Sequence, residues 1–385
     1  MRNRFMIYIL GAGVLTASFL SGCKAKGSDY YSEGVSYYQN AEYESAVASF
    51  EKAVSEDKSN AEYLVYLGMA MLETGDYSGA ANNFNAALSI EDDNRDAYRG
   101  LGLVSLYEED VNEAITNFSK VEELSAKYDA VCIDAMKYMA NCYFEIDNYT
   151  EAINVYTRIL NAMDKDDKTD KGYIHYLRGC CYVKLNDESN AALDYEQAIK
   201  YNGTDYELCC NMYYYFKDAG YQDRAESYLK RIIQAEDADA FLKGKIYCIL
   251  EDYLQAESYL LTAYDEGNKE AAYYLAMTYE KKQDYVNAEN LYKEYLGEHP
   301  NDYGIYNQYG AYMIGRGYYE NALVYIETGL ELAKDDEKQE LLFNQAVCYE
   351  YMGDFETAYT LFSEYIVKYP NDADARKELD FLSSR

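Results

Sequence analysis

The chain of 385 residues has no tryptophan, two prolines and two histidines. So little proline excludes collagen-like and polyproline chains and an ordinary turn-rich β protein. With only His175 and His299, most histidine-based catalysis and zinc sites built from several histidines are excluded as well. The sequence contains no Cys-x-x-Cys spacing, no glycine-rich phosphate loop and no Ser/His/Asp arrangement. We therefore expect no enzyme activity, no metal site and no cofactor.

Positive charge is also scarce, because 35 basic residues face 68 acidic ones and the net charge is −33. Nucleic acids and anionic lipid headgroups would be repelled by such a surface, so we expect no nucleic-acid partner. Hydrophobic residues make up 49% of the chain, which supplies a core and argues against general disorder. Tyrosine is abundant, with 49 occurrences.

The first 22 residues have the organisation of a secretory signal peptide. Arg2 and Arg4 precede an uncharged apolar run from Phe5 to Leu20, and small residues follow it. The run is shorter than the roughly 20 residues that a membrane-spanning helix needs. Leu20-Ser21-Gly22-Cys23 resembles the bacterial lipobox, in which the cysteine is lipidated and becomes the first mature residue. The alternative is an uncleaved N-terminal anchor in which the cysteine is coincidental.

The lipobox resemblance implies residues 1–22 as a lipoprotein signal peptide, Cys23 as the lipidation site and residues 23–26 as a short tether. It places the mature protein on the extracytoplasmic face of a bacterial membrane, either the cell membrane or the outer membrane. Two or three acyl chains anchor a protein stably where one chain is marginal. We therefore expect contact with the membrane through the lipid anchor alone.

From Gly27 onward one pattern recurs at intervals of 31 to 39 residues. We number each repeat so that its most regular residue, an alanine, is position 20. The alanines are Ala46, Ala80, Ala114, Ala152, Ala191, Ala225, Ala256, Ala288, Ala322 and Ala358. The large residues at position 24 are Phe50, Phe84, Phe118, Tyr156, Tyr195, Leu229, Leu260, Tyr292, Ile326 and Phe362. The residues at position 8 are Gly34, Gly68, Gly102, Ala140, Gly179, Tyr213, Gly244, Ala276, Gly310 and Ala346.

This pattern resembles the tetratricopeptide repeat, a helix pair of about 34 residues. Pro300 and Pro370 both fall at position 32, where that family ends its second helix. The resemblance implies an all-α, right-handed α-solenoid of about ten helix pairs, here called helix A and helix B of each repeat. Repeats 1–4 occupy 27–166, repeats 5–10 occupy 167–372, and a capping helix follows at 373–385. A charged loop at Asp164 to Lys171 is the most plausible bend, and Tyr213 makes the sixth repeat the least regular.

Helix A positions 2, 5, 9 and 12 line the concave groove in this family, and the resemblance therefore implies a set of partner-binding residues. They are Tyr31, Val35, Tyr38, Val65, Met69, Leu72, Arg99, Leu103, Leu106, Lys137, Asn141, Phe144, Tyr176, Tyr214, Phe241 and Tyr273. Their apolar character, with acids such as Glu62, Asp96 and Glu270 at position 2, predicts a protein or peptide partner with an apolar or basic segment. The alternative is that a narrow superhelix shields these side chains against neighbouring helices.

The carboxylate clamp by which some proteins of this family hold acidic chaperone tails is incomplete. Lys137 and Asn141 match its first pair, but Leu177, Glu207 and Asn211 stand where Asn, Lys and Arg are required. Twelve of the 49 tyrosines fall at positions 11 and 17, where we expect them to pack between helices.

Eight cysteines besides Cys23 leave disulfide pairing open, with Cys180 and Cys210 as the pair that could approach.

These features together predict a lipid-anchored scaffold that binds protein partners through its groove. The alternative is a glycan-binding or cell-wall-binding lipoprotein, because exposed tyrosines can stack on sugars. The absence of tryptophan and the scattering of groove tyrosines count against that alternative.

Replacing the lipobox cysteine tests the anchor directly. We expect Cys23→Ala to release the protein from membranes or to block cleavage of the signal peptide, because acylation needs the thiol. Membrane fractionation and electrophoretic migration measure the two effects. A Cys23→Ala variant that fractionates and migrates like the wild type would show that the lipoprotein interpretation is wrong.

Overall fold

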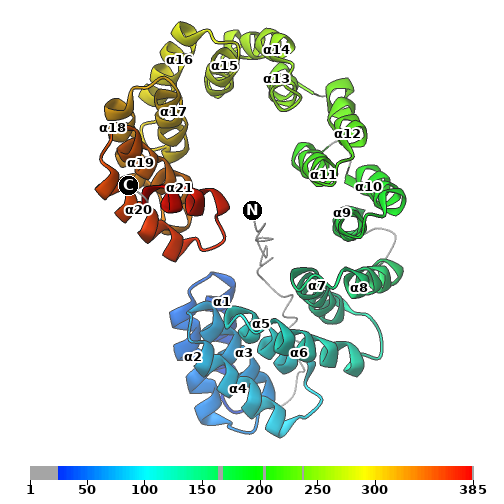
Figure 1. The fold of residues 1–385 in the computed structure, drawn as a ribbon. Coiled ribbons are helices and arrows are strands. Elements are labelled where there is room, and N and C mark those ends of the chain that lie inside the picture. The colour runs from blue at the N-terminus through cyan, green and yellow to red at the C-terminus, as the bar shows by residue number, and fades with distance from the viewer. Residues whose placement is uncertain (1–24, 164–167, 203–204, 236–237, 384–385) are drawn as a thin grey trace. The chain divides into compact units, whose positions relative to one another are not determined.

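The computed structural model describes residues 25–163, 168–202, 205–235 and 238–383. Within these ranges the chain contains 21 α-helices, one short 3₁₀-helix and no strand (Figure 1). The predicted all-α class is confirmed, and so is the number of helix pairs. Cys23 and part of the charged loop lie outside the described residues. None of the helices in the described ranges combines the length and apolarity that crossing a membrane requires.

The chain forms two compact units that divide between Tyr228 and Leu229. The first unit contains α1 (Ser28–Gln39), α2 (Tyr43–Glu56), α3 (Ala61–Glu73), α4 (Tyr77–Ile90), α5 (Arg95–Tyr107), α6 (Val111–Leu124), α7 (Ala130–Glu145), α8 (Tyr149–Ala162), α9 (Lys168–Lys184), α10 (Glu188–Asn202) and α11 (Tyr206–Asp218). The boundary falls within α12 (Gln222–Gln234). The second unit contains α13 (Ala240–Ile249), α14 (Tyr253–Asp265), α15 (Ala271–Lys281), α16 (Tyr285–Glu298), α17 (Tyr303–Gly315), α18 (Tyr319–Leu332), a 3₁₀-helix at Asp335–Glu337, α19 (Gln339–Tyr351), α20 (Phe355–Lys368) and α21 (Ala373–Ser383).

The turn between the two helices of a repeat follows from three consecutive residues. In repeat 2, Gly75 adopts a left-handed backbone with φ of 82°, which glycine tolerates without strain. Asp76 follows and accepts a hydrogen bond from the Gly79 N–H at 2.9 Å, which caps the start of α4. Tyr77 is then the first residue of the helix. The Gly75-Asp76-Tyr77 sequence thus ends helix A and begins helix B in repeat 2, and Gly353-Asp354-Phe355 does the same in repeat 10.

The core of each unit consists of the repeat positions that the periodicity identified. All ten alanines at position 20 are fully buried, and every residue at position 24 is at most 1% exposed. Glycine at position 8 permits this packing, since a Cβ atom on Gly34 would lie 2.6 Å from the Phe50 ring. On Gly102 the same atom would lie 2.5 Å from the Phe118 ring. Helix A and helix B therefore approach closely because the aromatic ring of one fills the space left by the glycine of the other.

The C-terminal helix closes the last repeat, as the sequence predicted. α21 buries Ala375 and Leu382 in the cluster that contains Phe362 and Tyr365 of α20. Asp372 caps α21 by accepting hydrogen bonds from the N–H groups of Asp374 and Ala375 at 3.1 Å each. The apolar surface of repeat 10, which no following repeat covers, is thereby removed from water.

A buried polar cluster joins α8, α9 and α10 and was not anticipated from the sequence. Asp194 is only 3% exposed, and His175 Nδ1 lies 2.7 Å from its Oδ1. Arg178 donates to both carboxylate oxygens at 2.7 and 2.8 Å, and to Thr157 of α8 at 2.8 Å. A bidentate guanidinium–carboxylate pair compensates the loss of hydration on burial. The cluster therefore fastens the fifth repeat to the fourth across the loop that breaks the period.

Removing one member of this cluster should be costly. We expect Asp194→Ala to destabilise the protein by about 3–5 kcal/mol, because the Arg178 side chain, which is only 17% exposed, would lose its counter-charge. Urea denaturation followed by circular dichroism measures the change. Asp374→Ala is the control, because Asp374 forms an exposed pair with Lys377 that should contribute little. Equal midpoints for the two variants would contradict a stabilising role for the cluster.

Enlarging a position-20 alanine tests the register of the repeats. Ala80→Leu places three additional carbons where α3 and α4 touch, and such overpacking costs about 1–3 kcal/mol. Ala48→Leu makes the same change at an exposed position of α2 and should leave the melting curve almost unaltered. Two superimposable melting curves would show that Ala80 does not lie at the contact between the helices.

Candidate functional site

Neighbouring helices A lie side by side, with position 5 of one repeat against position 2 of the next. The Tyr31 hydroxyl and Glu62 are in hydrogen-bond contact at 2.8 Å. Arg99 Nε donates to Asp134 at 2.6 Å, and Asn307 Nδ2 donates to Glu340 at 2.9 Å. The same pair of positions is used in both units. Positions 2 and 5 of these neighbouring repeats therefore lie on a shared face of helices A, and this face is the candidate binding surface.

The predicted binding residues differ in accessibility on this face. Tyr214 is exposed, whereas Tyr31, Val35, Tyr38, Leu106, Lys137, Asn141, Phe144, Phe241 and Tyr273 are half-buried. The buried members are Val65, Met69, Leu72, Arg99, Leu103 and Tyr176. Met69 and Leu103 are only 8% and 7% exposed. A partner would reach these two side chains only by displacing the parts of the chain packed on them.

Two of the predicted residues are cations, and both are paired with acids. Arg99 contacts Asp134 of α7, and Lys137 Nζ lies 2.8 Å from Asp170 of α9. Asn141, the other residue that matched a carboxylate clamp, accepts a hydrogen bond from the Tyr156 hydroxyl at 2.7 Å. The side chains that could have received an acidic tail are thus engaged within the chain.

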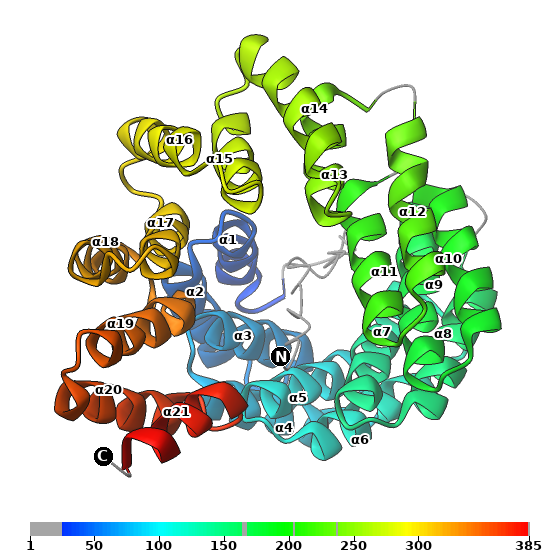
Figure 2. The same ribbon diagram turned by 45° about the horizontal axis from the view of Figure 1, so that its top comes forward.

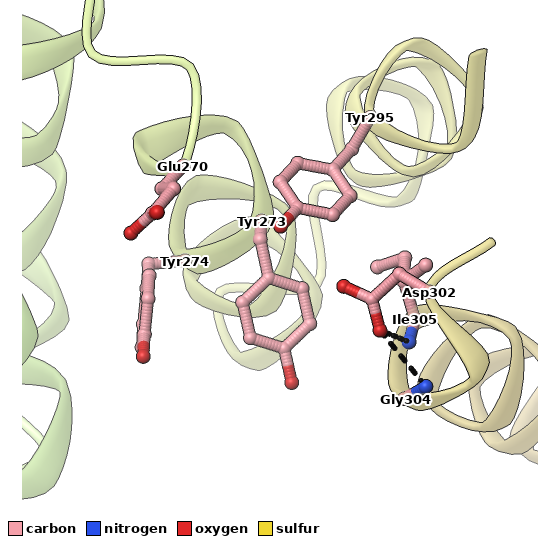
Figure 3. A pocket seen from close by; sticks show the side chains of 7 residues that line it. All are labelled: Glu270, Tyr273, Tyr274, Tyr295, Asp302, Gly304 and Ile305. Atoms are coloured by element: carbon pink, nitrogen blue, oxygen red, sulfur yellow. Dashed lines mark hydrogen bonds between the residues drawn. The ribbon is translucent and has the colours of Figure 1, made fainter. Parts of the chain in front are cut away.

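The second unit contains a pocket of about 240 Å³ where α15, α16 and α17 meet (Figure 3). These three helices follow one another in the chain and are adjacent in both views (Figure 2). The lining residues are Glu270, Tyr273, Tyr274, Tyr295, Asp302, Gly304 and Ile305. Three tyrosines and two acids thus converge at the N-terminal ends of two helices A.

The rings and the carboxylates are held by neighbouring structure. The Tyr273 ring lies 5.1 Å from that of Tyr274, nearly perpendicular to it, and 5.8 Å from that of Tyr295. Asp302 begins α17, and one of its carboxylate oxygens accepts hydrogen bonds from the N–H groups of Gly304 and Ile305 at 3.0 and 3.3 Å. Burial, followed by the nearby Tyr274 and Asp302, raises the pKa of the Tyr273 hydroxyl to about 12. Burial also raises the pKa of the Tyr295 hydroxyl, so Tyr273 and Tyr295 are neutral at physiological pH and offer π-faces beside two acids.

Sequence reasoning found part of this pocket. Glu270 and Tyr273 occupy positions 2 and 5, which the repeat pattern assigns to the groove. Tyr295 and Asp302 were missed. Their signal was present, because Tyr295 stands at position 27, where the repeat pattern takes a small residue. A residue that departs from the repeat pattern can therefore indicate a site, just as a residue can at a position where the pattern specifies no residue type.

The cysteines are core residues where the structure describes their contacts. Cys180 is a free thiol whose Sγ lies 3.2 Å from the Tyr195 hydroxyl, so the disulfide considered between Cys180 and Cys210 is not formed. Burial raises the pKa of the Cys180 thiol to about 12. Among the described residues no three His, Cys, Asp or Glu side chains are grouped so that they could hold a metal ion.

Family models described as tetratricopeptide repeat match residues 31–96, 134–162, 173–205, 241–303 and 340–372, more than half of the chain. No curated protein matches. Solved structures that are similar include yeast Tom70, with 15% identity and a TM-score of 0.49 over 92% of this chain and 88% of that one. A Parabacteroides merdae tetratricopeptide repeat protein shares 16% identity, with a TM-score of 0.45 over 66% and 98% of the two chains. The pilF protein of Pseudomonas aeruginosa shares 15%, with 0.43 over 54% and 90%.

The state of Cys180 can be tested by chemical modification. We expect iodoacetamide at pH 8 to leave Cys180 unmodified in the native protein, because burial raises the pKa of the thiol and keeps it protonated. Unfolding in urea without reductant should make Cys180 fully reactive. Peptide mapping by mass spectrometry measures both. Detection of a peptide in which Cys180 is joined to Cys210 would contradict the free thiol.

Proposed function

The chain belongs to the tetratricopeptide repeat family, and from this premise we propose that it is a lipid-anchored extracytoplasmic scaffold that binds protein partners through the helix A face. The face is preformed, so binding would require no chemistry and little rearrangement of the backbone. Lipidation at Cys23 would hold this surface at a bacterial membrane, where the effective concentration of membrane partners is raised. The lipobox sequence supports the anchor and the location.

One observation carries the proposal. Side chains at positions 5 and 2 of successive repeats contact one another in repeats 1 and 2, 3 and 4, and 9 and 10. Residues that are about 34 positions apart in sequence are thereby joined into one surface within each unit. A surface that continues over several repeats suits an extended peptide, a helix or a domain edge better than a small molecule.

The chemistry of the face favours a partner with basic and apolar groups. The two predicted cations, Arg99 and Lys137, are already paired with Asp134 and Asp170. Acids remain at the rim, and Glu270 is exposed. Half-buried apolar side chains such as Val35, Leu106 and Phe144 provide area to be removed from water.

Sugar binding receives less support, because many tyrosine rings stack on one another. Tyr77 lies 4.8 Å from Tyr107, and Tyr319 lies 5.1 Å from Tyr351, each pair nearly parallel. These pairs join the turn of one repeat to the next helix A. The ring faces buried between the two members of such a pair are not available to stack on a glycan.

The experiment is a capture of partners from native membranes with the full chain, followed by a comparison of variants. We expect Val35→Asp with Leu106→Asp to weaken the captured partner by about tenfold or more, because half-buried anchors contribute more than about 1 kcal/mol each. Both side chains are only half-buried, so the fold should tolerate them better than Asp at Met69 or Leu103.

The matched control places the same two charges on helices B of the same unit. Leu193 of α10 is 65% exposed and Leu124 of α6 is 39% exposed, so Leu193→Asp with Leu124→Asp should bind like the wild type. Circular dichroism verifies that both variants are folded. Equal binding by the two double variants would remove the helix A face of the first unit as the site.

A further inference from the structure

We propose that the pocket formed by Tyr273, Tyr274 and Tyr295 binds the ammonium or guanidinium group of one lysine or arginine side chain of the partner. This inference rests on the proposed function and names the chemistry that one part of the face recognises. The pocket lies on the helix A face of the second unit, because Glu270 and Tyr273 occupy the same positions, 2 and 5, as the residues that form the face elsewhere.

The aromatic walls suit a cation. A tyrosine ring carries negative electrostatic potential on its faces, and cations within about 6 Å of the ring centroid are attracted. The chain itself already uses these rings in this way. Lys245 Nζ lies 5.4 Å from the centroid of Tyr274 and 5.1 Å from that of Phe241. Tyr274 therefore attracts an ammonium group where it faces α13, while Tyr273 and Tyr295 line the opposite part of the pocket.

The two acids of the pocket, Glu270 and Asp302, favour a positively charged ligand. Helix N-termini favour anions, and both α15 and α17 begin at the pocket. At α17 that preference is already met, because one Asp302 oxygen accepts the N–H groups of Gly304 and Ile305. The second Asp302 oxygen is directed toward Tyr273 and Tyr295 (Figure 3). Glu270 adds a further charge, since its side chain does not cap α15. A cation in the pocket would meet two carboxylates and no buried positive charge among the lining residues.

The size of the pocket indicates a single side chain. Its volume of about 240 Å³ is below the roughly 300–1,000 Å³ of sites for whole cofactors or drug-sized ligands. An arginine or lysine terminus with part of its aliphatic stem is an occupant of the right shape, because the stem can pack on the ring edges while the charged group reaches the acids.

Repeat 10 offers a comparison, because it has the same two residue types at the same repeat positions. Tyr365 and Asp372 occupy positions 27 and 34 there, as Tyr295 and Asp302 do in repeat 8. The Tyr365 hydroxyl donates to Asp372 at 2.7 Å, and Gln339 donates to the Tyr365 hydroxyl at 3.1 Å. Position 1 in repeat 8 is Lys269, which pairs instead with Glu298 at 2.9 Å. In repeat 8 the Tyr295 hydroxyl likewise interacts with Asp302, and the contact that Gln339 makes in repeat 10 is replaced by the ion pair of Lys269 with Glu298.

The test titrates three small probes with the full chain and measures their binding by ligand-observed NMR. The probes are Nα-acetyl-lysine methylamide, its Nε-trimethyl derivative and Nα-acetyl-norleucine methylamide, which has a similar stem and no charge. We expect saturable binding of both cationic probes and none of the norleucine probe. Equal binding of all three probes, or of none, would overturn the proposal.

Two sets of variants locate the binding. Tyr273→Leu should weaken the cationic probes by about 2- to 30-fold, because it removes one π-face, while Tyr273→Phe keeps the ring and should bind within about twofold of the wild type. Glu270→Gln with Asp302→Asn should also weaken binding, and asparagine still caps α17. The matched control is Asp252→Asn with Asp354→Asn, which changes the charge equally at the caps of α14 and α20.

A weakening by the control that equals the weakening by the pocket variant would overturn the proposal, since net charge alone would then explain the binding. A failure of the pocket proposal can be distinguished from a failure of the proposed scaffold function. Probes that do not bind, combined with a partner that is captured by the helix A face, would reject the pocket and leave the scaffold function intact. Probes that bind, combined with partner capture that no change to the face affects, would support the pocket and reject the scaffold function.

Discussion

The close approach of helix A and helix B at repeat position 8 is the constraint on which the other packing depends. A Cβ atom on Gly68 would lie 2.7 Å from the Phe84 ring, and on Gly310 it would lie 2.6 Å from the Ile326 side chain. The position-24 side chain therefore occupies the volume that a larger residue at position 8 would need. The two helices of a pair lie close together at this point, so the pair has apolar side chains on both of its sides. Each of these sides has to be covered by a neighbouring repeat. The single helix α21 satisfies this requirement at the C-terminal end.

Apolar packing aligns the repeats, and polar contacts between them determine what the surface presents. Arg95 pairs with Asp129, Arg99 with Asp134 and Arg158 with Glu122, each across 34 to 36 residues of sequence. These pairs engage basic side chains, which are scarce in this chain because it has 35 basic residues and 68 acidic ones. The remaining acids give the molecule its negative surface. Each such pair also uses one acid, so the sign of that surface follows from the excess of acids in the composition.

Periodicity allowed the fold to be predicted in some detail, because positions 8, 20 and 24 of nearly every repeat carry the residue size that packing requires. Periodicity could not show how deeply a residue of the helix A face is buried. The position of a residue in the repeat indicates the direction of its side chain, but not which side chains surround it. Met69 and Leu103 stand at repeat positions that the resemblance assigns to the groove and are nearly inaccessible. The His175, Arg178 and Asp194 cluster was missed for another reason. Its members come from two helices of one repeat, and no other repeat carries them, so comparison between repeats could not reveal it.

The candidate site follows from those irregularities more than from the repeat itself. Tyr295 is large where the pattern requires a small residue, and the adjacent α17 begins with an acid that offers one oxygen to the helix and the other to the pocket. In the carboxylate clamps of this family, cations on helices A receive an acidic tail. Here Lys137, the one cation that matches the clamp, is paired with Asp170, while the second unit presents rings and carboxylates at its pocket. The same scaffold geometry, with the sign of the charge reversed, suits a partner that contributes the cation.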